Sequence, residues 1–482
     1  MATTAARNVL WIMCDQLTWL SLAAYGGPHA VATPAIDRLA REGMVLERCY
    51  TPSPVCVPAR FATLSGLYPH RTGCTGNATP LPWRVRTAAH HFGAQGRLTG
   101  FVGKMHPVDP QTHGFDLLVD FGHYYDYLGP KTSVFARGMG ADDSGSGVPW
   151  METYTNRRSP WRDRPAPPAE AELLEEADHP DAFFAREAGR FLRQCGGGRE
   201  PNGFFLFVSF LRPHRPFAAP AQVAARHRPE AVRLRPPPDG YHLEQVPAAA
   251  RRRALPGAFT PEGDAAARSW IAEYSANVEH VDACVGQVLD ALDEAGLTQD
   301  TLVAFMADHG EMLYDHGLVA KFTFFEASGR VPCILRGPGV PAGSRLAPVT
   351  DLTDLLPTSL EAAGLPPVAG LDGSSLWGAC GGGDRPPKGY AVGSLGLDGR
   401  HPMYMLRQGR WKYNRYAGGE QELYDLEADP GEWRNRAGDP TAAAVLRELD
   451  AALDARIGAE AARCQREGVA LPAAEAARAG AL

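Results

Sequence analysis

The sequence lacks the long apolar runs and charged blocks that mark several classes of protein. No stretch approaches the roughly 20 consecutive apolar residues of a membrane-spanning helix. The apolar run at residues 9–13 is too short for the core of a secretory signal, and no small-residue cleavage site follows it. No Lys/Arg-rich block is present and the formal net charge is -7, so neither a nucleic acid nor a membrane is expected as a partner. We therefore expect a cytoplasmic protein.

Paired cysteine motifs are also absent. The nine cysteines are scattered from Cys14 to Cys464, and none falls in a Cys-x-x-Cys pair. An odd number without such pairs predicts reduced thiols, which agrees with a cytoplasmic location. Hydrophobic residues make up 44% and charged residues 21% of the chain, as in ordinary soluble globular proteins.

The length of 482 residues predicts one large domain and one smaller domain, because a single core rarely grows so far. A break near residues 380–383 separates a domain at 1–378 from a subdomain at 379–482. Short strand patterns after the break, followed by a helix with apolar residues 446, 449, 453 and 457 on one face, predict an α+β subdomain. Two irregular segments, 139–179 and 213–263, are typical of linkers or of loops that cover a site.

Four short apolar runs, each followed by polar residues of chemical interest, predict the core of the large domain. Because the runs are apolar on both faces, they are expected to be buried parallel strands. The helical pattern of residues 271–292, with Gly296 near its end, supports an α/β fold with a mostly parallel sheet flanked by helices. The carboxyl ends of such strands carry ligand sites. The residues following the runs are Asp15 and Gln16, Lys104 and His106, His214, and Asp308 and His309.

The segment from Pro54 to Gly66 contains a candidate nucleophile. Pro58 favours the first turn of a helix, and Gly66 is suited to end it. Cys56 is then expected at the helix N-terminus, where backbone N–H groups attract anions. Arg60 lies one turn further, so its guanidinium can return toward Cys56. The arrangement suits attack on a sulfate or phosphate ester, and the alternative is a buried structural cysteine.

Cys-x-Pro-x-Arg at Cys56 resembles the signature of the sulfatase family in the alkaline phosphatase superfamily. Ala59, in place of the usual Ser, and the Asp15-Gln16 pair resemble the branch that holds choline sulfatases and phosphonate monoester hydrolases. Further segments resemble family motifs in the same order along the chain: 8–16, 33–40, 103–106, 308–311 with 316–318 and Lys321, 331–339, and 422–430.

The resemblance implies an alkaline-phosphatase-like fold and hydrolysis of a sulfate ester. In the family a formylglycine-generating enzyme oxidises the signature cysteine to formylglycine. The aldehyde hydrate of this formylglycine attacks sulfur and later expels sulfate. Asp15, Asp308 and His309 would hold one divalent cation, calcium first and manganese as the alternative. Gln16, where many members have a second Asp, and the converted Cys56 would complete the ligand set.

The resemblance also implies roles for the remaining candidate residues. Arg60 would orient the nucleophile, and His106 would serve as its base. Lys104 and Lys321 would bind the ester oxygens, and Lys321 or His214 would protonate the leaving oxygen. Asn77 resembles a donor to a substrate oxygen, although a lone Asn in a loop is more often a turn residue.

Three functions compete at this point. The first is hydrolysis of a small alkyl or aryl sulfate. The second is hydrolysis of phosphonate monoesters or phosphodiesters with the same site, and the third is binding without catalysis. Recognition of choline would need an aromatic cage, for which Tyr124, Tyr125 and Tyr127 with Asp126 are candidates, although ordinary packing is the commoner use of such a cluster. A homo-oligomer is compatible with the sequence.

Overall fold

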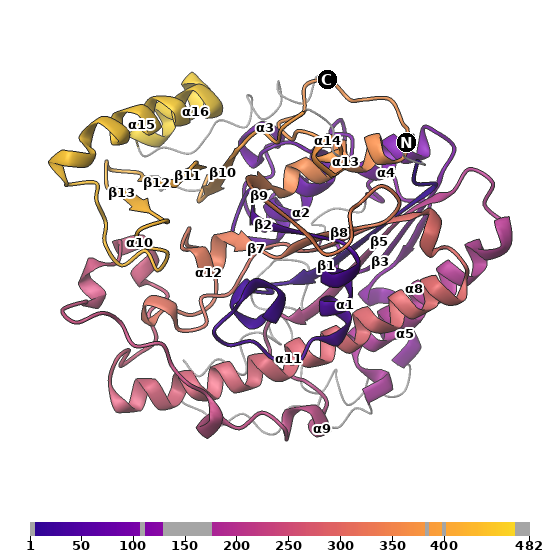
Figure 1. Cartoon of the computed structure of the whole chain (residues 1–482), viewed down its shortest axis with the longest axis horizontal. Helices are drawn as coiled ribbons and strands as arrows, with labels where there is room; N and C mark the ends of the chain where they lie inside the picture. The colour runs from indigo at the N-terminus through magenta and orange to yellow at the C-terminus, as the bar shows by residue number, and fades with distance from the viewer. Residues whose placement is uncertain (1–4, 107–110, 129–175, 381–384, 398–401, 468–482) are drawn as a thin grey trace.

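A large sheet forms the centre of the molecule, with helices on both faces (Figure 1). The computed structural model describes residues 5–106, 111–128, 176–380, 385–397 and 402–467. Most of the irregular segment predicted at 139–179 lies outside the described residues. None of the described helices combines the length and hydropathy that a membrane crossing requires. The cytoplasmic location stays a prediction.

The central sheet has nine strands, with the order β4-β3-β5-β1-β6-β8-β2-β7 and β9 paired to β2. The five strands from β4 to β6 are parallel, whereas β8 is antiparallel to both β6 and β2. The four predicted strands are therefore confirmed and are neighbours in the order β3, β5, β1, β6. The strands span β1 Asn8–Asp15, β2 Met44–Tyr50, β3 Leu98–Gly103, β4 Leu117–Val119, β5 Phe204–Pro213, β6 Thr301–Ala307, β7 Arg330–Val331, β8 Cys333–Arg336 and β9 Ser344–Asp351.

Helices α1, α8 and α11 lie on one side of the sheet, and α2, α4 and α13 on the other (Figure 1). Their bounds are α1 Pro34–Glu42, α2 Cys56–Ser65, α4 Ala88–Gly93, α8 Pro180–Cys195, α11 Pro261–Glu294 and α13 Leu355–Ala362. The other helices before the second sheet are α3 Pro69–Thr72, α5 Phe121–Leu128, α9 Ala221–Ala224, α10 Ala248–Arg251, α12 Glu326–Gly329 and α14 Trp377–Cys380. The flanking helices cover both faces, which explains why the parallel strands are apolar throughout.

The predicted helix over residues 271–292 is confirmed as part of α11. Thr260 caps its first turn by accepting from the Gly263 N–H, and Pro261 occupies the first helical position. The predicted apolar face is buried against β5 and α8. Gly296, with φ of 70°, follows the C-cap residue Ala295 in the left-handed conformation that glycine adopts without strain.

A second, antiparallel sheet follows near the C-terminus, as the sequence predicts. Its strands are β10 Tyr390–Leu395, β11 Met403–Gln408, β12 Trp411–Tyr416 and β13 Gln421–Asp425. Helices α15 Ala443–Ile457 and α16 Ala459–Glu467 pack on it through a separate apolar cluster that includes Tyr413, Leu423, Leu449 and Leu453. The boundary predicted between residues 378 and 379 stays a prediction.

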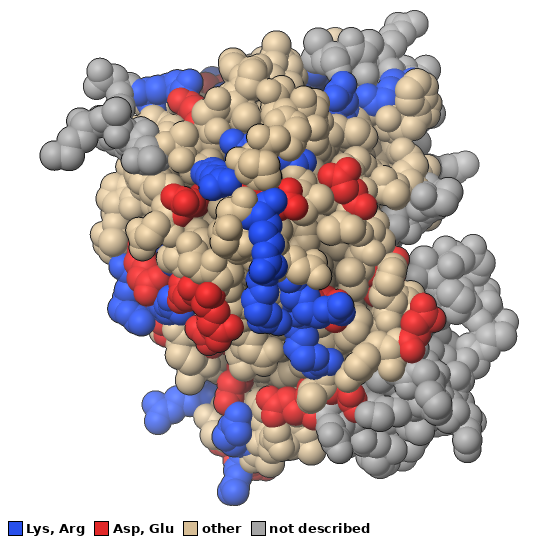
Figure 2. Space-filling view, turned by 90° about the vertical axis from the view of Figure 1, so that its right-hand side faces the viewer, with Lys and Arg blue, Asp and Glu red and all other residues tan. Residues whose placement is uncertain are grey.

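Positive and negative side chains mix on the surface. Figure 2 shows one face on which Lys and Arg side chains gather in a band, with Asp and Glu on both sides of it. Neither sign covers this face, which agrees with the small net charge of -7.

Lys412, on β12, joins the small sheet to the large domain. Its ammonium is fully buried and donates to the Phe324 carbonyl at 2.6 Å and to the Glu326 carboxylate at 3.0 Å. It also contacts the Glu432 carboxylate. Burial, and next the neighbouring Glu326, raise the pKa of Glu432 to about 8, although Lys412 opposes the shift. One cation thus balances two buried carboxyl groups.

We predict that Lys412→Met lowers the free energy of unfolding by about 3–5 kcal/mol, because it leaves Glu326 buried without its cation. Urea unfolding followed by circular dichroism measures the change. The control is Arg345→Gln, which removes a half-exposed ion pair with Glu47 and is expected to cost at most about 1 kcal/mol. Equal stability of Lys412→Met and the unmutated protein would show that this ion pair does not hold the two sheets together.

Candidate active site

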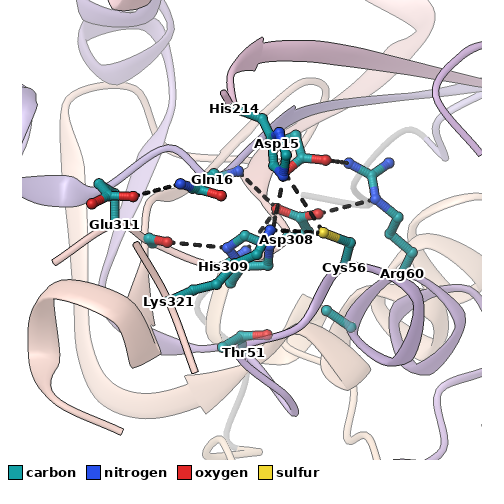
Figure 3. Close-up of polar contacts among 12 residues, drawn as sticks. Asp15, Gln16, Thr51, Cys56, Arg60, His214, Asp308, His309, Glu311 and Lys321 are labelled. Atoms are coloured by element: carbon teal, nitrogen blue, oxygen red, sulfur yellow. Dashed lines mark hydrogen bonds and ion pairs between the residues drawn. The ribbon is translucent and has the colours of Figure 1, made fainter. Parts of the chain in front are cut away.

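The residues at the carboxyl ends of four parallel strands lie close together, as predicted. Asp15 is the last residue of β1, and Asp308 comes directly after β6. Lys104 follows β3, and His214 follows β5. Figure 3 shows Asp15, His214 and Asp308 converging near Cys56. The site therefore lies at the carboxyl edge of the sheet, where open α/β folds bind ligands.

Cys56 is the first residue of α2, as the sequence predicts. Val55, the N-cap, is extended, and Gly66 ends the helix with φ of 67°. The side chain of Asn77 accepts a hydrogen bond from the Val57 N–H at 3.1 Å, so it satisfies one of the free amides of the first turn. Every residue of α2 is buried, which fixes the sulfur of Cys56 within the protein.

Arg60 binds both metal-candidate aspartates. Its Nη2 donates to Asp15 Oδ2 at 3.1 Å, and its Nε donates to Asp308 Oδ2 at 3.0 Å. Its Nη1 donates to the Lys104 carbonyl at 2.6 Å and also to the Ser209 hydroxyl. All five donors of a guanidinium lie in one plane, so these contacts orient the helix as well as the carboxylates.

Asp15, Cys56, Asp308 and His309 form a buried cluster that could hold a metal ion. Their ligand atoms all lie within 4.8 Å of one another. His309 Nε2 is 3.4 Å from Cys56 Sγ and 3.7 Å from Asp15 Oδ1. His309 Nδ1 lies 3.0 Å from the Gly310 carbonyl, so a proton on Nδ1 leaves the Nε2 lone pair facing the cluster. Two carboxylates, one imidazole and one neighbouring side chain at residue 56 fit a divalent cation.

Cations surround the sulfur of Cys56. The Lys321 ammonium donates to Cys56 Sγ at 2.9 Å, and the Lys104 ammonium contacts Asp15 on the other side. Burial opposes ionisation of Cys56, but Lys104, Lys321 and His309 outweigh it and hold the pKa of this thiol well below its usual range. The surrounding charges therefore stabilise negative charge at residue 56, which is the charge that an ester oxyanion brings.

The neighbouring titratable groups show the same positive environment. Burial and Cys56 disfavour ionisation of Asp15, yet Lys104, His214 and Arg60 hold its pKa well below the usual range. Burial, and next Lys321, lower the pKa of His214 to about 3. Burial also lowers the pKa of His106, although a hydrogen bond with Cys56 opposes the shift. All predicted catalytic side chains thus act on Cys56 or Asp15.

Glu311 and Ser209 belong to the site, although sequence analysis gave them no role. Glu311 is fully buried and accepts from the Gln16 side chain, from Trp270 Nε1 at 3.3 Å and from the Ala320 N–H (Figure 3). The Ser209 hydroxyl accepts a hydrogen bond from Arg60 and donates one to the Lys104 carbonyl at 2.8 Å. A polar residue inside the apolar run of β5 was the available signal for Ser209.

Two of the tyrosines considered as a choline cage, Tyr124 and Tyr127, are used elsewhere, and the side chain of Tyr125 lies outside what the structure describes. Tyr124 is buried against Phe183 and Phe184, and its hydroxyl donates to the Asp178 carbonyl at 2.8 Å. Tyr127 donates to the Asp178 carboxylate at 2.8 Å. These contacts support ordinary packing of α5 on α8.

Comparison with known proteins identifies the family. The sulfatase model matches residues 7–365, and the model of the N-sulphoglucosamine sulphohydrolase C-terminal region matches residues 314–458. A choline-sulfatase of Rhizobium meliloti is 32% identical, over 91% of this chain and 84% of its own. A multifunctional alkaline phosphatase superfamily protein of Trinickia caryophylli is 27% identical, over 92% of this chain and 93% of its own.

Among solved structures, the phosphonate monoester hydrolase of Agrobacterium radiobacter superposes with a TM-score of 0.76 at 26% identity, covering 94% of this chain and 96% of that one. This similarity confirms the alkaline-phosphatase-like fold, and together with the choline-sulfatase it confirms the predicted branch. The match to the family model covers most of the chain, including every strand of the large sheet. The chain therefore belongs to the sulfatase family and is a sulfuric ester hydrolase.

Proposed function

We propose that the protein hydrolyses a sulfate ester of a small alkyl or aryl alcohol, with a nucleophile made from Cys56 and one divalent cation. The observation that carries the proposal is the position of Cys56. Its sulfur lies at a helix N-terminus, 2.9 Å from the Lys321 ammonium and 3.4 Å from the His309 imidazole. An ester bound next to this side chain would contact both the nucleophile and the positive charge around it.

Asp15, Asp308 and His309 would hold the cation, with Gln16 and residue 56 as further ligands. The Gln16 Nε2 group donates to Glu311, so its amide oxygen is the end left for a cation. Calcium fits these oxygen donors first, and manganese is the alternative. When bound, the cation would supply a Lewis acid that neutralises charge on the ester oxygens.

The protein's own side chains bind the ester and handle its protons. Lys104 and Lys321 would bind the ester oxygens, and the support is that their ammonium groups contact Asp15 and Cys56. Lys321 or His214 would donate a proton to the leaving oxygen, and His106 would accept one from the hydrate of converted Cys56. Arg60 keeps Asp15 and Asp308 in place, Asn77 accepts from the first turn of α2, and its amide nitrogen would donate to a substrate oxygen.

A second candidate is hydrolysis of phosphonate monoesters or phosphodiesters by the same residues. Its support is the likeness to a phosphonate monoester hydrolase, with a TM-score of 0.76. Monoanionic esters of sulfate and of phosphonates present similar charge, so one pocket suits both. The formylglycine-generating enzyme would be the maturation partner in either case.

We predict that protein co-expressed with a formylglycine-generating enzyme cleaves an aryl sulfate faster than the matched aryl phosphonate monoester. The ratio of the two kcat/KM values measures the preference, and Cys56→Ala prepared in the same way is the inactive control. Faster phosphonate cleavage would favour the second candidate. Turnover by Cys56→Ala at the rate of the converted protein would contradict both candidates.

We predict that His309→Ala loses the divalent cation and its turnover, because the change removes a ligand and leaves two carboxylates as the main donors. Mutation of a residue that only contacts a metal ligand costs up to about 100-fold in metal affinity. Because His309 would be a ligand itself, its loss is expected to cost at least about 100-fold. Elemental analysis after dialysis measures bound calcium and manganese, and aryl sulfate cleavage measures activity.

His123→Gln is the matched control, since His123 is an exposed histidine on α5 that pairs with Asp120. It should retain the wild-type metal content and rate. An His309→Ala protein with full metal and full turnover would refute the assignment of this ligand set.

A further inference from the structure

Arg215 and Arg253 lie beside the catalytic cluster, on two different segments of the chain. Arg215 directly follows His214 at the end of β5. Arg253 follows α10, and its carbonyl accepts from the Val319 N–H at 3.0 Å. The bridge between Ala254 and Leu318 fixes the same contact. Arg215 is thus next to His214, and Arg253 contacts the segment that leads to Lys321. Both His214 and Lys321 act on Cys56.

Aromatic rings support both guanidinium groups. The Arg215 guanidinium lies 5.2 Å from the centre of the Trp270 ring. The Arg253 guanidinium lies 4.1 Å from the centre of the Phe322 ring, and Phe322 directly follows Lys321. Stacking holds the planar groups in place but leaves their N–H donors available in the plane.

The part of the chain that the structure describes gives these two arginines no ion-paired carboxylate. Both side chains are half-buried, and the buried Nε of Arg215 has no hydrogen-bond partner. Glu311 acts on both charges, but it is already bound by Gln16, Trp270 and the Ala320 N–H. Burial, and next the charge of Arg215, lower the pKa of Arg253, whereas the charge of Glu311 raises it. Guanidinium groups held by stacking and without a paired carboxylate are suited to bind an anion through charge-assisted hydrogen bonds.

We propose that Arg215 and Arg253 bind a second anionic group, a carboxylate or another sulfate, on the alcohol part of the ester. The inference rests on the proposed function and narrows its substrate class. Arg215 directly follows His214, and Arg253 stacks on Phe322, which directly follows Lys321, so we place the second group next to the ester. Two guanidinium groups at this position repel a quaternary ammonium, which separates this protein's substrate from choline sulfate.

Two esters of equal size test the subsite: carboxyphenyl sulfate and carbamoylphenyl sulfate, each as meta and para isomers. For the converted protein we expect kcat/KM to be at least about tenfold higher for the better carboxylate isomer than for its amide. Arg215→Gln and Arg253→Gln should each lower this ratio severalfold. Arg252→Gln removes an exposed positive charge one residue away and should leave the ratio unchanged.

Binding of the same esters to Cys56→Ala, measured by calorimetry, separates failure of the subsite from failure of the proposed function. Tighter binding of the carboxylate ester that depends on Arg215 supports the subsite even if the converted protein cleaves neither ester. Equal affinity and equal kcat/KM for carboxylate and amide would overturn the proposal. If Arg215→Gln and Arg253→Gln lower kcat/KM by the same factor for both esters, the proposal is overturned as well.

Discussion

The Arg60 guanidinium between Asp15 and Asp308 is the contact on which the site depends. The two carboxylates come from neighbouring strands β1 and β6 and are fully buried, so they would repel each other without a shared cation. Arg60 lies one helical turn after Cys56 in α2. The same contacts that hold the carboxylates together therefore fix the helix whose first residue is Cys56, and so the position of Cys56 relative to the two carboxylates.

The other half of the site comes from an irregular segment, and buried charges hold its shape. Between Asp308 and Glu326 the chain has several non-glycine residues with positive φ, including Leu313, Ala320 and Phe322. Such conformations persist only where surrounding contacts enforce them. Glu311 binds the Ala320 N–H, and Lys412 of the second sheet binds the Phe324 carbonyl at 2.6 Å. Lys321 lies between these anchors, so the small sheet contributes to the position of the ammonium group that contacts Cys56.

Sequence analysis predicted the residues that follow regular elements. Apolar strands end at Asp15 or directly before Lys104, His214 and Asp308, and parallel strands place such residues at one edge. Cys56 and Arg60 follow from helix periodicity. Glu311, Arg215 and Arg253 were given no role, because their positions depend on irregular loops and on contacts far apart in sequence, such as Val319 with Arg253. The functional roles of the predicted residues stay predictions.

The central claim is that turnover requires the conversion of Cys56. The most direct test uses samples of the protein with different degrees of conversion, obtained by varying co-expression of the formylglycine-generating enzyme. Mass spectrometry of the tryptic peptide from Cys49 to Arg60 measures the fraction of chains that have lost sulfur at Cys56. The account predicts that the rate of aryl sulfate cleavage per total protein is proportional to this fraction and extrapolates to zero without conversion. A rate that does not change with the converted fraction would contradict it.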